Sequence, residues 1–304
     1  MYHGLRLAVV VPAYNEADRI ADTLRGIPAF VDEIIVVDDA SQDGTSQAVP
    51  AHERAGLSLV RHDRNRGVGA AIATGYRLAL KRGCDVAVVM AGDGQMDPTD
   101  LPALLAPIVA GRADYSKGNR FAHADLRSAM PPLRRVGNLL LSWLSRVASG
   151  YFHLFDSQCG FTAATQTILR RIDLDALYPR YGYPNDLLAR LAVVGARVED
   201  VPVRPIYGPA WRSGIRLHTA IYPVLFVVVR SWLWRLWQQA LRRRPLDQRT
   251  DVWPHGSLES PARLASSLPS LGRVAQFPDA DRSQGDSSSS SAKSSAGSSR
   301  APRV

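Results

Sequence analysis

Residues 33–45 of the chain, EIIVVDDASQDGT, decide its fold. The apolar part of this stretch, 33–37, is short and rich in β-branched residues, which is typical of a strand buried on both faces of a parallel sheet. It ends directly in Asp38 and Asp39, and a turn follows at Asp43-Gly44. Open α/β sheets bind their ligands at the carboxyl ends of their strands, so this stretch predicts a parallel sheet and a site at its edge.

Similar strand-like runs alternate with helical patterns on both sides of this stretch. Because strands that alternate with helices form βαβ units, the sequence predicts an α/β fold with a mostly parallel sheet flanked by helices. The expected strands are 5–11, 33–37, 57–60, 86–90, 161–164 and 198–203. The expected helices are 17–26, 44–55, 68–82, 133–147 and 185–194, with another that opens at 98–100.

The composition excludes several classes of protein. The chain has 304 residues, 46% of them hydrophobic, which is enough for one large or two small domains with a sizeable core. Two cysteines exclude a disulfide scaffold and suit a reducing compartment. The formal net charge is +9, but residues 212–244 contain seven arginines and no acidic residue, and the rest is close to neutral. This local excess disfavours a nucleic-acid-binding protein.

The chain divides into three predicted segments. Residues 1–211 carry the α/β pattern, residues 212–245 are basic and rich in tryptophan, and residues 246–304 form a Ser-rich tail. We expect the tail to be disordered, because it cannot bury enough apolar area to offset its ordering entropy. The apolar run at 7–11 is too short for a signal peptide, and no run reaches the ~18 to 20 apolar residues of an ordinary membrane-spanning helix.

Polar motifs follow four of the predicted strands. They are 12–16 (PAYNE), 38–45 (DDASQDGT), 64–69 (RNRGVG) and 91–98 (AGDGQMDP). The first turn has no G-x-G-x-x-G sequence and the chain has no Walker lysine motif, which argues against a dinucleotide site or a P-loop. Carboxylates suit a ribose or a divalent cation, and arginines suit a diphosphate. The motifs therefore predict a site for a nucleotide diphosphate compound and a metal ion.

These four motifs resemble those of family 2 glycosyltransferases with the GT-A fold, a Rossmann-like arrangement. The closest similarity is to the branch of dolichyl-phosphate mannosyltransferase and bacterial polyprenyl-phosphate glycosyltransferases, and it covers about residues 5–205. The resemblance implies a GT-A catalytic domain over 1–211. It also implies a metal-dependent, inverting hexosyltransferase that moves a sugar from a nucleotide-diphosphate sugar to a polyprenyl phosphate.

The resemblance also implies roles for residues of the donor site. Pro12, Tyr14 and Glu16 would line the base and ribose pocket, and Val37 and Asp39 would complete the nucleotide-sugar site, with Asp39 on the nucleoside. By itself, a carboxylate after a strand can also cap the turn that follows, and that alternative stays open for Asp38 and for Asp43.

The metal site implied by the resemblance departs from the family pattern. Asp93 matches the last aspartate of the D-x-D-type motif and would act in catalysis by holding Mg²⁺ or Mn²⁺, but the first position is Ala91. Gln95 would be the second ligand. Magnesium often needs only one or two protein carboxylates, so the site is chemically reasonable, although its affinity would be lower. As an alternative, Asp93 could cap the helix that opens near Pro98, but Asp97 is better placed for that role.

Arg120, Arg134 or its neighbour Arg135, and Gln158 are the residues that the resemblance places on the acceptor side. The arginines would meet a phosphate, with a solvated surface arginine as the alternative for each. Gln158 belongs to a segment, 156–161, that lies beneath the acceptor in the family.

Asp186 is the predicted catalytic residue on the acceptor side. It would act as base if the acceptor were a hydroxyl, but a phosphate acceptor is already anionic and needs no strong base. Alternatively, Asp186 is simply an acidic residue favoured at a helix N-terminus. A hydroxyl-directed enzyme and a catalytically silent binding scaffold, which Ala91 favours, remain alternative functions.

The basic segment is the basis for predicting that the protein associates with a membrane. Residues 217–229 are almost wholly apolar, arginines follow, and four of the six tryptophans lie between 211 and 237. Tryptophan and arginine favour the headgroup level, so we expect helices that lie on the cytoplasmic face of a membrane. Pro223 and Arg230 disfavour spanning. A core helix and a dimer interface remain alternatives. The sequence fixes neither the sugar, the nucleotide nor the oligomeric state.

Overall fold

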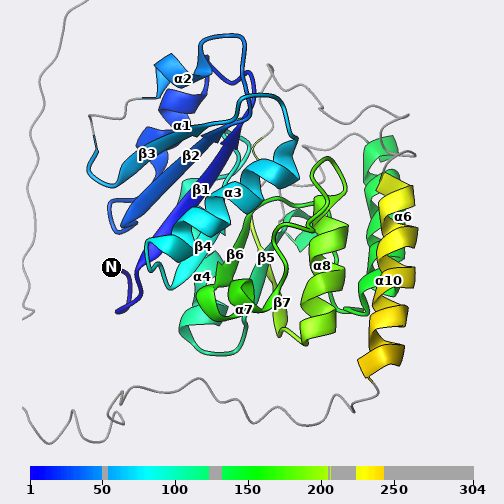
Figure 1. The fold of residues 1–304 in the computed structure, drawn as a ribbon. Coiled ribbons are helices and arrows are strands. Elements are labelled where there is room, and N and C mark those ends of the chain that lie inside the picture. Colours follow the sequence, from blue (N-terminus) through cyan, green and yellow to red (C-terminus); the bar gives the residue numbers. More distant parts are fainter. Residues whose placement is uncertain (50–53, 123–131, 205, 207–223, 243–304) are drawn as a thin grey trace, which may run out of the picture. The chain divides into compact units, whose positions relative to one another are not determined.

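A single mixed sheet forms the centre of the protein (Figure 1). The structure, a computed structural model, describes residues 1–49, 54–122, 132–204, 206 and 224–242. Within these ranges the sheet has seven strands in the order β3-β2-β1-β4-β6-β5-β7. They are β1 Leu7–Ala13, β2 Glu33–Asp38, β3 Leu57–Arg61, β4 Val86–Val89, β5 Tyr115–Asn119, β6 Thr162–Thr165 and β7 Val198–Pro202.

The register of the strands brings the predicted motifs to one edge of the sheet. Strand β1 pairs in parallel with β2 and β4, and β2 pairs in parallel with β3. Ala13 is opposite Asp38, which in turn is opposite Arg61, so these three strands end side by side. Strand β6 is antiparallel to both β4 and β5. The mostly parallel α/β fold predicted from the sequence is confirmed.

Helices cover both faces of the sheet. They are α1 Ile20–Gly26, α2 Thr45–Ala48, α3 Val68–Lys81, η1 Pro98–Asp100, α4 Leu101–Val109, η2 Arg120–Ala122, α6 Pro132–Ser149, α7 Gln166–Arg171, α8 Tyr183–Val194 and α10 Phe226–Arg242. Val10 and Ile35 face one core with α3, α7 and α8, whereas Val9 and Ile34 face the other with α1 and α4. Because successive side chains of a strand point to opposite faces, the central residues of β1 and β2 are apolar on both faces.

Some predicted elements differ from those of the structure. The helix expected over 44–55 is the single short helix α2, because Val49 already has an extended backbone. The segment expected to be basic and membrane-associated is described only from Val224, where α10 packs on α6 and α8. The compact unit that holds the sheet spans Met1–Gln248. The predicted disordered tail and the residues 207–223 lie outside the described residues.

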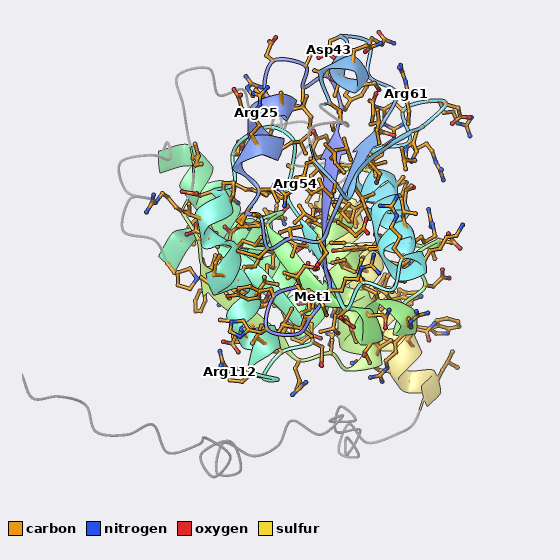
Figure 2. The ribbon with its side chains drawn as sticks, turned by 90° about the vertical axis from the view of Figure 1, so that its left-hand side faces the viewer. Met1, Arg25, Asp43, Arg54, Arg61 and Arg112 are labelled. Carbon is orange, nitrogen blue, oxygen red and sulfur yellow. The ribbon has the colours of Figure 1, made fainter. Side chains whose placement is uncertain are left out.

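Charged side chains surround the sheet domain, and their positive and negative charges largely balance. Arg25, Asp43, Arg61 and Arg112 lie at the outside of the ribbon (Figure 2). Arg25 pairs with Asp22, at 2.8 Å between its Nη1 and Oδ1. Exposed pairs of this kind contribute little to stability.

A buried polar cluster underlies β5 and β7. Lys117 is 1% exposed, and its ammonium group donates a hydrogen bond to the backbone carbonyl of Cys159. Opposite Lys117 in the register, Asp200 accepts from Phe155 N at 2.6 Å and from Asn119 Nδ2 at 3.1 Å. Its other oxygen, Oδ1, has no hydrogen-bond partner among the described residues. Burial raises the pKa of Asp200 to about 6.

We expect Gly75→Ala to destabilise the protein by about 1–3 kcal/mol through overpacking. A Cβ on this α3 residue would lie 2.1 Å from Val10 Cγ1 in β1, where the strand cannot move aside. Gly137→Ala in α6 is the matched control, because nothing lies within 4 Å of its added Cβ and alanine favours the helix by about 0.5–1 kcal/mol. Chemical unfolding measures both, and equal stability of the two variants would contradict the packing described here.

Asp200→Asn should stabilise the protein at neutral pH but not at pH 4. The pKa of Asp200 in the folded protein is about 6, above the ordinary value of 3.8 for an aspartate, so the folded state binds more protons between these values. The wild type therefore loses stability as pH rises through this window. The asparagine removes that loss, at most about 3 kcal/mol at about 1.4 kcal/mol per pKa unit. Unfolding curves measured from pH 4 to 7 should diverge, whereas parallel curves would show that burial of the carboxylate carries no cost.

Candidate functional site

A pocket opens at the carboxyl edge of β1, β2 and β4, and all four polar motifs contribute to it. Loops 158–161 and 180–184 form the opposite side. The predicted site residues that line this pocket are Pro12, Tyr14, Glu16, Asp39, Asp93, Gln95, Arg120 and Gln158. Two predicted residues, Val37 and Asp186, are not among the lining residues, and the side chain of Arg134 lies outside the described residues.

The first two motifs are locked together beneath the pocket. Asn15, at a positive φ of 57°, donates its backbone N–H to Ser41 Oγ at 2.9 Å and accepts from Gln42 N at 2.9 Å. Glu16 N donates to Thr45 Oγ1 at 2.8 Å. These bonds hold the loops after β1 and β2 in one geometry.

Asp38 caps the turn after β2. Its Oδ1 accepts from Ser41 N at 2.8 Å, and its Oδ2 accepts from the hydroxyl of Ser46. The sequence left two interpretations of Asp38 open, contact with a ligand and capping of the turn. These contacts favour capping of the turn. Val37 is likewise fully buried in the core and lies beneath the pocket rather than in its wall.

Asp39 presents a fixed carboxylate to the pocket. Its Oδ1 accepts from Arg66 N at 2.8 Å and contacts His62 Nδ1 at 2.7 Å, and its Oδ2 accepts from Gly67 N at 2.7 Å. His62 in turn contacts Thr74 Oγ1 of α3 at 3.1 Å through Nε2. Three partners from the next strand and helix thus orient one side chain that is 3% exposed.

His62 is a site residue that the sequence analysis did not single out. It follows β3 directly, at the edge where the motifs meet, and this position was the available signal. Gly67, which belongs to the third predicted motif, has a φ of +96°, and an added Cβ would lie 2.4 Å from the Pro179 carbonyl oxygen. Only glycine allows this loop to approach segment 178–184 so closely.

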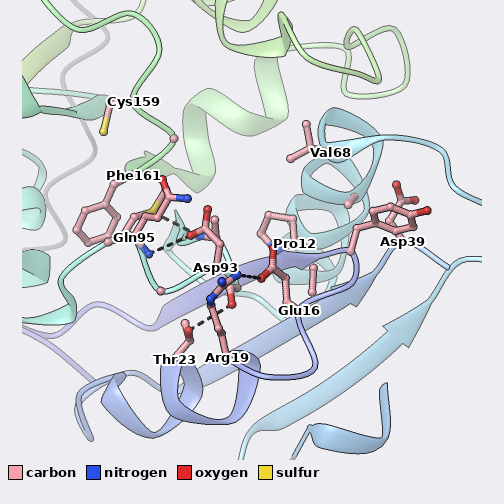
Figure 3. Close-up of a pocket in the computed structure, with 18 of the residues that line it drawn as sticks. Pro12, Glu16, Arg19, Thr23, Asp39, Val68, Asp93, Gln95, Cys159 and Phe161 are labelled. Carbon is pink, nitrogen blue, oxygen red and sulfur yellow. Dashed lines mark hydrogen bonds and ion pairs between the residues drawn. The ribbon is translucent and has the colours of Figure 1, made fainter. Parts of the chain in front are cut away.

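Asp93 and Glu16 bring two carboxylates to the middle of the pocket. Figure 3 shows them together with Arg19 and Gln95. Burial raises the pKa of Asp93, and burial together with the negative charge of Asp93 raises the pKa of Glu16. Burial, and the charges of Asp93 and Glu16, also raise the pKa of Tyr181, so loop 180–184 faces this pair. Negative charge is therefore concentrated here, with Arg19 Nη1 at 3.3 Å from Glu16 Oε2.

This pair fits a divalent cation. No three metal-ligating His, Cys, Asp or Glu side chains converge within the described part of the chain. One or two carboxylates nevertheless suffice for an ion that takes its remaining ligands from water and substrate phosphates. At the position of the missing first aspartate, Ala91 N donates to Met96 Sδ at 3.3 Å. Asp93 accepts from Gln95 N at 3.0 Å, whereas Asp97 is the residue that caps η1.

Arg120, which lines the pocket, forms a fork with the fully buried carboxylate of Asp156. Arg120 Nε and Nη2 donate to Asp156 Oδ2 and Oδ1 at 2.7 and 3.0 Å. Burial by itself would raise the pKa of Asp156, but the charge and hydrogen bonds of Arg120 keep it below its ordinary value. Next to this pair, Gln158 Nε2 donates to Ser157 Oγ at 2.9 Å. The arginine that lines the pocket is thus held in place by a charge behind it.

Asp186, the predicted catalytic residue on the acceptor side, is not part of the lining of the pocket. It is 2% exposed, outside the lining of the pocket, and its Oδ2 accepts from Tyr178 N at 2.9 Å and from Arg190 Nε at 2.8 Å. A base must reach the proton that it removes. The sequence placed Asp186 correctly at the start of a helix, α8, but its carboxylate faces away from the pocket into contacts with the chain.

Comparisons with known proteins agree with this site. The family model described as Glycosyl transferase family 2 matches residues 8–178. An undecaprenyl-phosphate mannosyltransferase of Micrococcus luteus is 33% identical over 204 residues, covering 66% of this chain and 83% of the relative. A polyprenol monophosphomannose synthase of Mycolicibacterium smegmatis is 30% identical over 233 residues, covering 72% and 85%.

A solved structure shares the fold. Glucosyl-3-phosphoglycerate synthase of Mycobacterium tuberculosis, in complex with Mn²⁺, uridine diphosphate and phosphoglyceric acid, matches with a TM-score of 0.57. It is 20% identical, and the match covers 76% of this chain and 78% of that chain. With the family model spanning more than half of the sequence and its motifs gathered in one pocket, the chain belongs to glycosyl transferase family 2 and is a glycosyltransferase with the GT-A fold.

Proposed function

We propose that this glycosyltransferase moves one sugar from a nucleotide-diphosphate sugar to a polyprenyl phosphate at a membrane surface, with inversion at the anomeric carbon. The observation that carries the proposal is the uneven distribution of charge around the pocket. Among the described lining residues, every carboxylate comes from the part of the chain before residue 94. The part of the chain after residue 94 contributes arginines and no carboxylate to the lining; these are Arg120, Arg180 and Arg204.

This distribution supports an anionic acceptor. A hydroxyl acceptor requires a base within reach, and Asp186 is engaged elsewhere. A phosphate acceptor is already ionised at neutral pH and is attracted by arginines. The names of the relatives from Micrococcus luteus and Mycolicibacterium smegmatis point to the same acceptor class for this chain.

The donor would bind across the motif edge of the sheet. Pro12, Tyr14 and Glu16 line that side of the pocket, and the fixed carboxylate of Asp39 can accept hydrogen bonds from the nucleoside. Asp93 and Gln95, with Glu16 close by, would hold Mg²⁺ or Mn²⁺. A bound cation there would offset the charge on the nucleotide diphosphate as it departs.

The transfer itself requires little proton chemistry from the protein. An oxygen of the acceptor phosphate forms a bond to the anomeric carbon from the face opposite the diphosphate, and the bond between that carbon and the diphosphate oxygen breaks. The buried fork between Arg120 and Asp156 fixes a cation on the acceptor side, so that its position does not have to be reorganised during transfer. Arg134, on α6, is proposed to meet the same phosphate.

The exposed faces of α6 and α10 support attachment to a membrane surface. Large apolar side chains on these faces are exposed, namely Leu139, Leu140, Trp143, Trp232, Leu233, Leu236 and Trp237. The opposite side of α10 is buried, because Val227 and Ser231 pack against the domain. No helix in the described ranges is long and apolar enough to cross a bilayer. A helix that is apolar outside as well as inside suits a position between the domain and lipid.

Asp93→Asn should reduce transfer by at least 100-fold, because it removes the main ligand for the cation. The assay follows a labelled sugar from nucleotide sugars into polyprenyl phosphate in mixed micelles with Mg²⁺ or Mn²⁺. Asp63→Asn is the control, because it alters an exposed carboxylate that does not line the pocket. Full turnover by the wild type in a metal chelator would refute the role of Asp93.

Replacing Trp232, Leu233 and Trp237 together by serine should lower binding to anionic phospholipid vesicles at least tenfold, because each apolar side chain buried in lipid contributes about 1.5–3 kcal/mol. Vesicle flotation measures the bound fraction. Replacement of Arg6, Arg25 and Arg112 by serine removes three exposed charges that lie outside α6 and α10, and it should have a much smaller effect. Undiminished binding by the apolar triple variant, with a loss only in the arginine variant, would mean that net charge, and not this face, drives binding.

A further inference from the structure

The buried contacts of Asp186 join α8 to α10 and to the segment before α8. Besides accepting from Tyr178 N and Arg190 Nε through Oδ2, Asp186 accepts from Ser231 Oγ of α10 at 3.3 Å through Oδ1. Both carboxylate oxygens are therefore engaged by the chain itself. Ser231 is 1% exposed, so this contact lies inside the interface between the helices.

Arg190 extends the same junction in both directions. Its guanidinium donates to the carbonyl of Ala176 and, at 3.5 Å, to that of Asp173. On its other side, the guanidinium carbon lies 5.0 Å from the centre of the Trp234 ring of α10, a cation–π distance. The pair of Asp186 and Arg190 thus holds segment 173–178 through three backbone groups and holds α10 through two side chains.

The segment held in this way continues directly into a wall of the pocket. Residues 180–184 line the pocket, and the Pro179 carbonyl accepts from Ala70 N at 3.1 Å at the start of α3. Gly67, which donates to the Asp39 carboxylate, lies against the same carbonyl. Movement of this wall would therefore disturb the hydrogen bonds around the nucleoside-binding carboxylate.

Helix α10 also contacts this wall directly. Gly182 has a φ of +109°, and a Cβ built on it would lie 3.2 Å from Val227 of α10. Val224, just before α10, lines the pocket itself. The side of α10 that faces the domain therefore forms part of the support of the pocket.

We propose that Asp186 is a positioning residue, which together with Arg190 fixes wall 178–184 against α10, and that it removes no proton from the acceptor. The position of α10 then determines the shape of the donor pocket. This inference rests on the proposed function for its meaning in catalysis, but it concerns contacts that exist before any acceptor is bound.

Ser231→Ala, Trp234→Leu and Asp186→Asn test the proposal from the two sides of the junction. Titration of the purified full chain in detergent with Mn²⁺ and uridine or guanosine diphosphate, whichever the wild type binds, gives the dissociation constant. We expect at least a fivefold rise for Trp234→Leu and Asp186→Asn and a smaller rise for Ser231→Ala. Asp175→Asn is the matched control, since it breaks an ion pair between the same segment and Arg77 that is exposed. Its dissociation constant should equal that of the wild type.

Kinetics separate positioning from proton removal. With a lipid-linked acceptor, we expect a higher KM for the nucleotide sugar and an unchanged pH dependence of kcat in all three variants. Wild-type binding and KM in Ser231→Ala and Trp234→Leu would overturn the proposal. A loss in Asp186→Asn that is confined to kcat and alters its pH dependence would do the same. If Asp186→Asn does not fold, the two α10 variants decide. Failure of the proposed function would instead appear as a wild type that transfers nothing to polyprenyl phosphate.

Discussion

The carboxylate of Asp39 is the point on which the arrangement of the site depends. Asp39 directly follows β2, and its carboxylate oxygen atoms accept hydrogen bonds from the backbone of Arg66 and Gly67, which begin the approach to α3. His62 adds a third bond from the end of β3. A buried carboxylate without these partners would be strongly unfavourable, so the loops after β2 and β3 must close around it. That closure brings Gly67 against Pro179 and thereby joins the two sides of the pocket.

Much of the fold follows from the sequence because the central strands are buried on both faces. An uninterrupted run such as 33–37 leaves few alternatives to a parallel strand, and polar residues at its end then mark the binding edge. Strand β5 could not be recognised in this way, since it reads YSKGN. Its lysine and asparagine are buried and paired with β7, and only the tertiary structure provides those partners.

In the candidate site, too, some features could be predicted from the sequence and others could not. Residues carried by contiguous motifs, such as Glu16 and Asp93, do line one pocket. The direction of a single side chain is harder to predict, because an acidic residue at a helix start fits both a catalytic and a structural role. Asp186 and Val37 lie next to the site in sequence, but their side chains are turned into the protein. The direction is decided by distant partners such as Ser231, which no local pattern reveals.

The close packing of Gly75 on Val10 has a consequence beyond stability. Helix α3 begins at Val68, and Val68 and Ala71, about two turns and about one turn before Gly75, line the pocket. Because Gly75 has no side chain, α3 can pack close to the sheet. This contact sets the distance between the first turn of the helix and the sheet. One hydrogen atom in the place of a methyl group therefore sets the position of the pocket wall that the first turn of α3 forms.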